Sequence, residues 1–263
     1  MGIATELFRF RNYVVSSIVR DFTLRYRGAL GGIALIFFAP AIQIAIYVIV
    51  FGNLLKGHLS NIESPYAYSI FLCTGIVFWN FFTELLQAIQ GLFLENANLL
   101  KKASFPFVVL PVVKLATSTI NLLLPLAFIV FFVVAATNVS ASNFWYLIIV
   151  WFMLSALALS MGMCLCILQV FFRDFRLLTP FALQGLFWCT PIIYPEEVLP
   201  IWVIKLMPFN PLYAPFLTAQ SAVLDMHIPS LEAWISTLIF ITVIAFGAHH
   251  LYKKNRADML DNI

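Results

Sequence analysis

The sequence contains few charged residues. Only 10% of its 263 residues are Asp, Glu, Lys or Arg, whereas 62% are hydrophobic. Because a soluble domain has about 25% charged residues, this composition excludes an ordinary soluble domain. It indicates an all-α membrane protein whose residues 1–263 form a single transmembrane domain, with no room for a soluble domain of ordinary size.

The sequence also lacks familiar chemical motifs. It has no GxxxxGK[ST], HExxH, CxxC or GxSxG pattern, which excludes ATP binding through a phosphate loop and gives no support to a familiar catalytic site. The net charge of +3 comes from basic residues at the borders of apolar runs, so we expect no nucleic-acid partner. The histidines show no ligand spacing with carboxylates, so we expect no metal and no cofactor in this chain. The cysteines lie in apolar runs, which predicts buried thiols: Cys73, Cys164, Cys166 and Cys189.

Long apolar runs are what the sequence has instead, and they predict six membrane-spanning helices. The runs cover residues 33–51, 66–94, 107–136, 144–172, 177–194 and 233–252. Most basic residues lie on the side of the first segment, and the opposite loops hold only Lys56 and Lys205. Both termini are therefore predicted to be cytoplasmic. No cleavable signal is expected, because the polar, arginine-rich N-terminus precedes the first apolar run.

Two charges stand inside the predicted spans near their cytoplasmic ends, Glu84 and Lys114. An ionisable group inside a membrane is a candidate functional group, because it is costly to keep there. The alternative is a structural role, since a lysine side chain can extend to the interface.

Residues 1–30 form a basic N-terminal segment. Polar positions between residues 5 and 27 recur at three- and four-residue steps, and apolar positions do so on the opposite side. This pattern predicts an amphipathic helix at the cytoplasmic membrane interface.

Residues 95–106, ENANLLKKASFP, form a polar, basic island between two apolar runs. Asn96 and Asn98 offer capping oxygens for a helix start, and Pro106 disfavours helical geometry at Phe105. We therefore predict a short helix across the cytoplasmic membrane surface. It is either a contact for a soluble partner or an ordinary turn.

Residues 191–215 contain six prolines among apolar residues. An interior proline costs a helix about 3 kcal/mol, so this segment cannot be one helix, yet it is too apolar for a solvated loop. Short re-entrant helices in the outer leaflet satisfy both constraints, because broken backbone is tolerated where protein covers it. We interpret this segment as an outer gate with these candidate residues: Tyr194, Pro195, Trp202 and Phe209.

Phenylalanine is abundant, with 27 residues against 6 Trp and 9 Tyr. Most aromatic side chains in a membrane protein face lipid or form interfacial belts. Some can instead line a wide path in which flat rings stack on sugars. The candidates for such stacking are Phe37, Tyr47, Trp79, Phe187 and Trp188.

The order of several segments resembles one family. RDFTLRYRGALGG followed by FFAPAIQIAIYVIVFG resembles the start of the permease subunits of ABC exporters for lipid-linked polysaccharide, which include the O-antigen, capsule and teichoic acid exporters. LLKKASFPFVVLP is similar to the cytoplasmic coupling segment of that family. FRDFRLLTPFALQGLFWCTPIIYP and then FNPLY are similar to its outer gate and NPL signature. The chain departs from the family pattern at Ala34, where a Trp is common, and near Ala219 and Gln220, where an Arg is often found.

The resemblance implies a half-transporter in the cell inner membrane. Two copies would form a channel, and two copies of a separate ATP-binding subunit would supply ATP and Mg²⁺. The substrate would be a lipid-linked glycan moved outward from the cytoplasm. The implied ATPase-coupling residues are Asn98, Leu99, Leu100, Lys101, Lys102 and Phe105. The residues implied to hold a lipid pyrophosphate, unless they are only positive-inside anchors, are Arg9, Arg11, Arg25 and Arg27.

Three other functions are compatible with a membrane protein of this kind. One is a permease for a drug or a small lipid. Another is a membrane-embedded lipid-glycan transferase, which needs paired carboxylates, and the adjacent acid pair here is Glu196 and Glu197. The third is an ion-coupled transporter, which would want several ionisable groups at mid-membrane and internal repeats, and the sequence shows neither.

Overall fold

The computed structural model describes residues 8–26, 67–100, 106–136, 143–226 and 228–262, and also residues 42, 45, 46 and 49. Within these ranges four helices are long and apolar enough to cross a membrane. They are α4 (Ala67–Gln90), α7 (Val109–Ala136), α8 (Tyr146–Phe171) and α12 (Leu231–Asn262). These helices confirm the predicted second, third, fourth and last apolar runs as helical. The first predicted span, with Phe37 and Tyr47, lies outside the described residues apart from four single positions.

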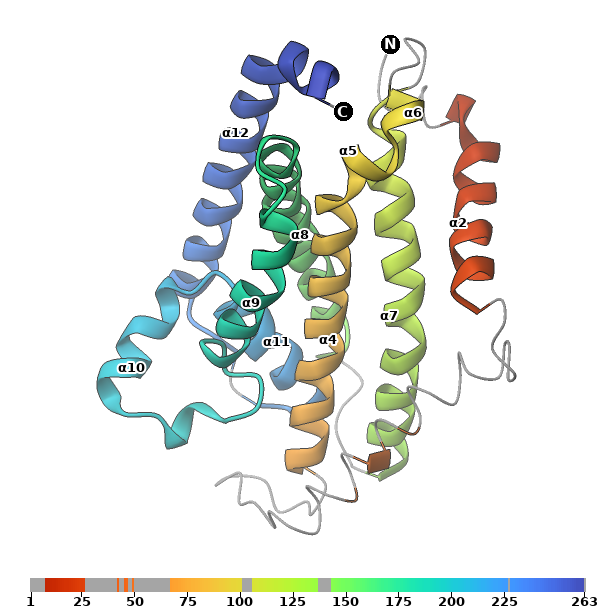
Figure 1. Cartoon of the computed structure of the whole chain (residues 1–263). Helices are drawn as coiled ribbons and strands as arrows, with labels where there is room; N and C mark the ends of the chain where they lie inside the picture. Colours follow the sequence, from red (N-terminus) through yellow and green to blue (C-terminus); the bar gives the residue numbers. More distant parts are fainter. Residues whose placement is uncertain are drawn as a thin grey trace.

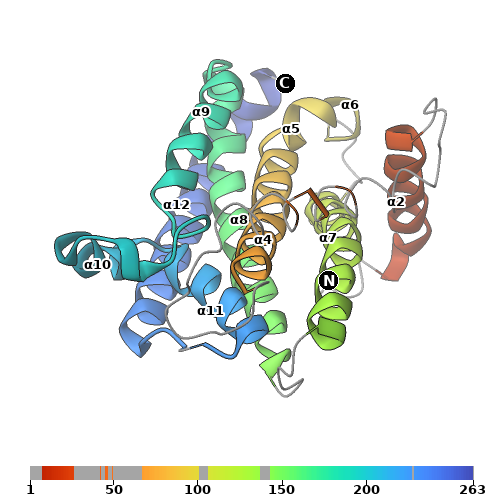
Figure 2. The ribbon, with the colours of Figure 1, turned by 90° about the horizontal axis from the view of Figure 1, so that it is seen from below.

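Helix α4 is the centre of the bundle. It packs against α7, α8 and α11, and Figure 2 shows it between α7 and α8. In its most apolar stretch 78% of the residues are buried, compared with 17% for α12, so α4 is enclosed by protein and α12 presents most of its surface outward. The side chains of Phe78, Phe82 and Leu85 are fully buried. An apolar helix with most of its surface exposed, such as α12, suits lipid contact.

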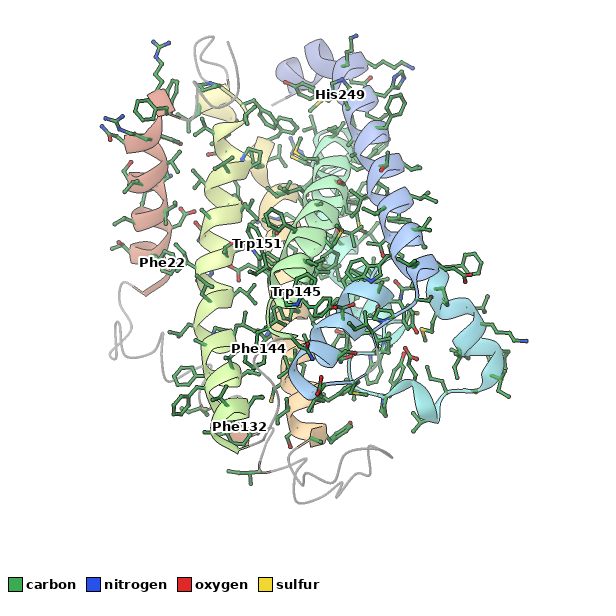
Figure 3. The ribbon with its side chains drawn as sticks, turned by 180° about the vertical axis from the view of Figure 1, so that it is seen from behind. Phe22, Phe132, Phe144, Trp145, Trp151 and His249 are labelled. Atoms are coloured by element: carbon green, nitrogen blue, oxygen red, sulfur yellow. The ribbon has the colours of Figure 1, made fainter. Side chains whose placement is uncertain are left out.

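Two contacts fix the neighbours of α4. Gly162 of α8 lies so close to α4 that an added Cβ would be 2.8 Å from Ile89 Cβ and 2.9 Å from the Leu86 carbonyl oxygen. Small residues permit such close helix approach in membranes. About three turns earlier in α8, Trp151 Nε1 donates to Thr119 Oγ1 of α7 at 3.1 Å (Figure 3).

The fifth apolar run forms α9 (Phe175–Trp188), which is shorter than predicted. It ends before Pro191, because proline has no backbone N–H and restricts the residue before it. Four short helices follow: η2 (Glu196–Val198), α10 (Ile201–Leu206), η3 (Met207–Phe209) and α11 (Tyr213–Leu224). The prediction of short helices is confirmed, although they continue beyond residue 215. Figure 1 shows α10 projecting from one side of the bundle while α11 lies within it, and nearly every α11 residue is buried.

In the described part of the predicted island helix, and in the turn before it, two short helices follow α4. They are α5 (Leu92–Glu95) and α6 (Ala97–Leu100), separated from α4 by Gly91 and from each other by Asn96. Asn96 Nδ2 donates to the Leu92 carbonyl at 3.0 Å, so its side chain binds the preceding turn. Residues 101–105, with Lys101, Lys102 and Phe105, lie outside the described residues.

Helix α2 (Arg11–Tyr26) confirms that the basic N-terminal segment contains a helix. Its axis follows that of α7 (Figure 1), against which it packs. Its Arg11 end, α6 and the last turns of α12 lie at one end of the bundle, which we call the α6 end. His249 lies near that end of α12 (Figure 3) and is exposed.

The four cysteines are free. The prediction of buried thiols is confirmed for Cys73 and Cys166, and Cys164 is partly buried. The prediction of a buried thiol is wrong for Cys189, which is exposed. This residue is the C-cap of α9, where the helix ends and neighbouring side chains no longer cover it.

Two glycine substitutions are expected to have opposite effects. Gly162→Ala forces the α4–α8 crossing apart against backbone, which should destabilise the fold by about 1–3 kcal/mol. Gly247→Ala in α12 meets no atom within 4 Å, and alanine favours a helix by about 0.5–1 kcal/mol over glycine. Thermal unfolding of the two purified variants in the same detergent measures both effects. An equal or higher midpoint for Gly162→Ala than for Gly247→Ala would contradict the close crossing.

Candidate functional site

A polar pocket lies at the α6 end of the bundle. Its volume is about 590 Å³, and α2, α4, α5, α7, α8 and α9 all contribute to its lining. It holds charges of both signs, contributed by five side chains: Asp21, Glu84, Glu95, Lys114 and Arg176. A water-accessible pocket with this lining lowers the free-energy cost of placing charged side chains inside the membrane.

The two intramembrane charges that the sequence singled out both face this pocket. Lys114 Nζ lies 3.4 Å from Asp21 Oδ2 and 3.9 Å from Glu95 Oε2. Glu84 Oε1 accepts a hydrogen bond from Asn121 Nδ2 at 2.6 Å. Both charges therefore have polar partners on other helices, and together these contacts join α2, α4, α5 and α7. Asp21 and Glu95 had no separate signal in the sequence, because their closeness to Lys114 depends on the fold.

Two glutamines complete the pocket. Gln90 Nε2 donates to the Phe175 carbonyl at 3.1 Å, which ties the end of α4 to the start of α9. Gln169 of α8 is 2% exposed, and its Oε1 has no hydrogen-bond partner in the described part of the chain. The end of α4 and the start of α9 therefore meet α8 at this pocket.

Three of the six coupling residues implied by the resemblance lie in the described part of the chain, in the short helix α6 at the tip of the bundle. Asn98, Leu99 and Leu100 belong to α6, and Leu99 is partly buried. Figure 1 shows α6 at the α6 end of the bundle, near the Arg11 end of α2. A soluble partner can therefore reach α6 without crossing the bundle.

The structure describes three of the four arginines proposed for a pyrophosphate. Arg9 and Arg11 are exposed, and their guanidinium groups lie 5.9 Å from the Phe10 ring centroid and 4.5 Å from that of Phe8. The backbone positions of Arg11 and Arg25 lie near opposite ends of α2, about 21 Å apart at a rise of about 1.5 Å per residue. Arg27 lies outside the described residues.

At the opposite end, side chains from several helices bind the broken backbone after α9. Gln220 Nε2 of α11 donates to the carbonyls of Pro191 and Ile192, both at 3.3 Å. Tyr68 Oη of α4 donates to the Ile193 carbonyl at 2.8 Å. An added Cβ at Gly75 of α4 would lie 2.9 Å from Gln220 Nε2, so glycine leaves room for this arrangement. We call these side chains, with Asn210 and Thr237 described next, the carbonyl clamp.

Asn210 and Thr237 complete the carbonyl clamp. Asn210 Nδ2 donates to the Cys189 carbonyl at 3.0 Å, and Asn210 Oδ1 accepts from the Leu212 N–H at 3.0 Å. Thr237 Oγ1 of α12 donates to the Pro211 carbonyl at 2.9 Å. The NPL signature thus has a structural role, since its asparagine joins the end of α9 to the start of α11. Sequence reasoning noted Gln220 only as a departure from the family pattern, and it missed Tyr68 and Thr237.

The predicted gate residues occupy different environments. Tyr194 is partly buried, and its hydroxyl donates to the Trp188 carbonyl at 2.5 Å. Pro195 is also partly buried, whereas Trp202 and Phe209 are 68% and 77% exposed. The segment therefore has an anchored part at Tyr194 and an apolar surface on α10 and η3.

Three of the proposed sugar-stacking residues form a continuous row. The ring centroids of Trp79 and Phe187 are 5.3 Å apart, and those of Phe187 and Trp188 are 5.7 Å apart. Trp79 is partly buried beside Phe216, while Trp188 is 58% exposed. The row therefore runs from α4 to the surface of α9. In the described ranges no group of three His, Cys, Asp or Glu residues is placed to hold a metal ion.

Comparison with known proteins assigns the chain to a family. Residues 13–224 match the sequence model of the family described as "ABC-2 type transporter". The chain belongs to the ABC-2 type transporter family. It is a multi-pass inner-membrane permease, and in such systems ATP is hydrolysed by a separate ATP-binding subunit. The family resemblance drawn from the sequence is therefore confirmed.

Relatives of this ABC-2 permease carry a more specific name. The chain is 21% identical to an O-antigen export system permease protein, RfbA, of Myxococcus xanthus over 99% of both chains. Two RfbA proteins of Klebsiella pneumoniae are 23% and 22% identical to it, each over 92% of both chains. These permeases and the present chain therefore correspond along nearly their whole length.

A change at Gln220 tests the carbonyl clamp of the permease. Gln220→Leu leaves the Pro191 and Ile192 carbonyls without this donor, which should cost about 1–3 kcal/mol of stability. Gln184→Leu is the matched control, since Gln184 is exposed on α9. Thermal unfolding in detergent and limited proteolysis of residues 191–215 measure the effect. The clamp is contradicted if Gln220→Leu unfolds and is cleaved like the control.

Proposed function

We propose that this chain is the transmembrane subunit of an ATP-driven exporter that moves a lipid-linked polysaccharide outward across the inner membrane. Two copies of the chain form the channel, and two ATP-binding subunits drive it. The observation that carries the proposal is the correspondence, over nearly the full length, with permeases named for O-antigen export. Two features of the fold support it: the aromatic row of α4 and α9, which reaches the surface at Trp188, and the position of α6 at the tip of the bundle.

The charge distribution supports a cytoplasmic α6 end. Basic residues of this end include Arg9, Arg11, Lys253 and Lys254, which are exposed, while α10 at the other end holds Lys205. Cytoplasmic borders carry an excess of Lys and Arg. The ATP-binding subunit therefore meets α6 from the cytoplasm. The outer gate lies at the other end, with Tyr194 and Pro195 in its anchored part.

The second copy of the chain faces α9 in this proposal. The side chains of Leu177, Leu178 and Phe181 are 70%, 56% and 76% exposed along this helix, with Trp188 at its end. A channel between two such faces would present Phe187 and Trp188 to sugar rings, whose apolar faces stack on aromatic rings. Trp202 and Phe209 would close the outer end between the copies. The lipid pyrophosphate would bind Arg11, the first residue of α2, and Arg9 just before it.

Orientation is testable by labelling. In a variant without the four native cysteines, single cysteines at Asn61 and Asn143 should react with a membrane-impermeant maleimide in intact cells. Cysteines at Ala103 and Asn255 should react only after the membrane is opened, because basic borders stay cytoplasmic. Labelling of Ala103 from outside would reverse the orientation and remove α6 from the reach of an ATP-binding subunit.

The contact between residues 98–105 and the ATP-binding subunit can be tested by mutation. Buried apolar anchors dominate protein interfaces, whereas exposed rim charges contribute about 0.2–1 kcal/mol each. We therefore expect Leu100→Asp or Phe105→Asp to abolish co-purification of the ATP-binding subunit and to stop glycan export. Lys101→Ala should weaken binding only modestly, with a larger loss at high salt. Membrane insertion of each variant, measured by protease protection, is the control.

Two outcomes, one from these variants and one from a transport assay with the wild type, would contradict the proposal. If both Asp variants keep the ATP-binding subunit and still export glycan, α6 is an ordinary turn. If the wild-type complex in proteoliposomes transports a drug or a small lipid but no lipid-linked glycan, the substrate class is wrong.

A further inference from the structure

Lys114 joins three elements at the α6 end. Its Nζ lies 3.4 Å from Asp21 Oδ2 on α2 and 3.9 Å from Glu95 Oε2 on α5, while Lys114 itself belongs to α7. Both ion pairs seen among the described residues share this ammonium group. Helix α5, which precedes α6, and the N-terminal helix α2 are therefore linked through the side chain of Lys114.

The Glu95 arm of this link depends on a glycine. An added Cβ at Gly91 would lie 2.7 Å from Glu95 Oε1, so the carboxylate occupies space that only glycine leaves free. The Glu95 N–H donates to the Gly91 carbonyl at 3.0 Å, which fixes the turn that carries it. An alanine at this position would displace the flexible carboxylate and leave the backbone in place.

The Asp21 arm links α2 to the bundle. Helix α2 packs against α7, and Asp21 and Lys114 have side chains that are 23% and 24% exposed. Partly buried charges are screened less by salt than exposed ones, so this pair is more than a surface contact. Because a lysine has three donors, Lys114 can bind both carboxylates at once and shift between them when one moves.

We propose that Lys114 is a positioning residue that transmits movement of the α5–α6 segment to α2. The inference rests on the proposed function, in which an ATP-binding subunit displaces α6. When α5 moves, the distance between the Glu95 carboxylate and the Lys114 ammonium group changes. The attraction between Lys114 and Asp21 changes with it, and this shifts α2. Since α2 begins with Arg11 and follows Arg9 directly in the chain, the step that is driven by ATP then repositions the segment proposed to hold the lipid pyrophosphate.

The test measures the two movements separately. In proteoliposomes with the ATP-binding subunit, one pair of spin labels at Ser16 and Lys253 reports α2, and a second pair at Ala97 and Lys253 reports α6. In the wild type, a non-hydrolysable ATP analogue should shift both distances. In Lys114→Met the α6 shift should persist, the α2 shift should be lost, and glycan export should fall about fivefold or more, as for a typical coupling energy.

Other variants isolate each arm. Asp21→Asn and Gly91→Ala should give the same pattern, because each removes one carboxylate from Lys114 and neither alters the lysine. Asp21→Asn also serves if Lys114→Met does not fold. Lys114→Arg should restore the α2 shift, and Lys254→Met, an exposed change of the same type on α12, should behave like the wild type.

The outcomes separate this inference from the proposed function. A normal α2 shift in Lys114→Met overturns the role of Lys114 alone, and so does a wild type in which α6 shifts without α2. A wild type in which α6 does not respond to nucleotide overturns the proposed coupling, and the role of Lys114 with it.

Discussion

The end of α9 imposes the main constraint on the structure. A chain that breaks inside a membrane leaves carbonyl groups that water does not reach, and each unsatisfied group costs several kcal/mol. Here five of the six carbonyls from Trp188 to Ile193 accept hydrogen bonds from side chains of α4, α11 and the segment between α9 and α11, and the Thr190 carbonyl accepts from the Ile192 N–H. The burial of α11 and its contact with α4 follow from this requirement, because Gln220 reaches the break only from inside the bundle.

Polar groups inside the membrane are stabilised differently at the two ends of the bundle. The α10 end uses neutral donors such as Tyr68, Asn210 and Gln220, which hold backbone carbonyls in fixed places. The α6 end uses charges in a pocket that water can reach, where Lys114 is shared by Asp21 and Glu95. Neutral hydrogen bonds at defined distances favour one arrangement, whereas a shared, partly exposed ammonium group permits several at little cost. The rigid end is the one proposed as gate anchor, and the adaptable end is the one proposed to meet the ATP-binding subunit.

The sequence predicted what depends on neighbouring residues in the chain. Apolar runs gave the long helices, and the prolines between residues 191 and 215 gave the break, since both effects are local. It did not identify Gln220 or Tyr68, because the donors that face a broken backbone are set by helix packing. Glu84 and Lys114 were noted as intramembrane charges, but their common pocket with Asp21 depends on how α2 lies against α7. The four arginines were grouped by charge alone, and the length of α2 separates the backbone positions of Arg11 and Arg25.

Helix α4 connects the two ends directly. At about 1.5 Å per residue, its 24 residues span about 36 Å, from Tyr68 and Gly75 beside the carbonyl clamp to Gly91 beside Glu95. Its side chains are buried on nearly all sides, and close-packed interiors transmit displacement because they compress little. A movement of the α6 tip that reaches α4 therefore also reaches Gln220 and Ile192, which touch Gly75. The chain thus contains two connections from its tip: a buried helix toward the outer segment, and an ion pair toward α2. The first acts by rigidity and needs no charge, so it is insensitive to salt, whereas the second depends on charges that salt screens in part.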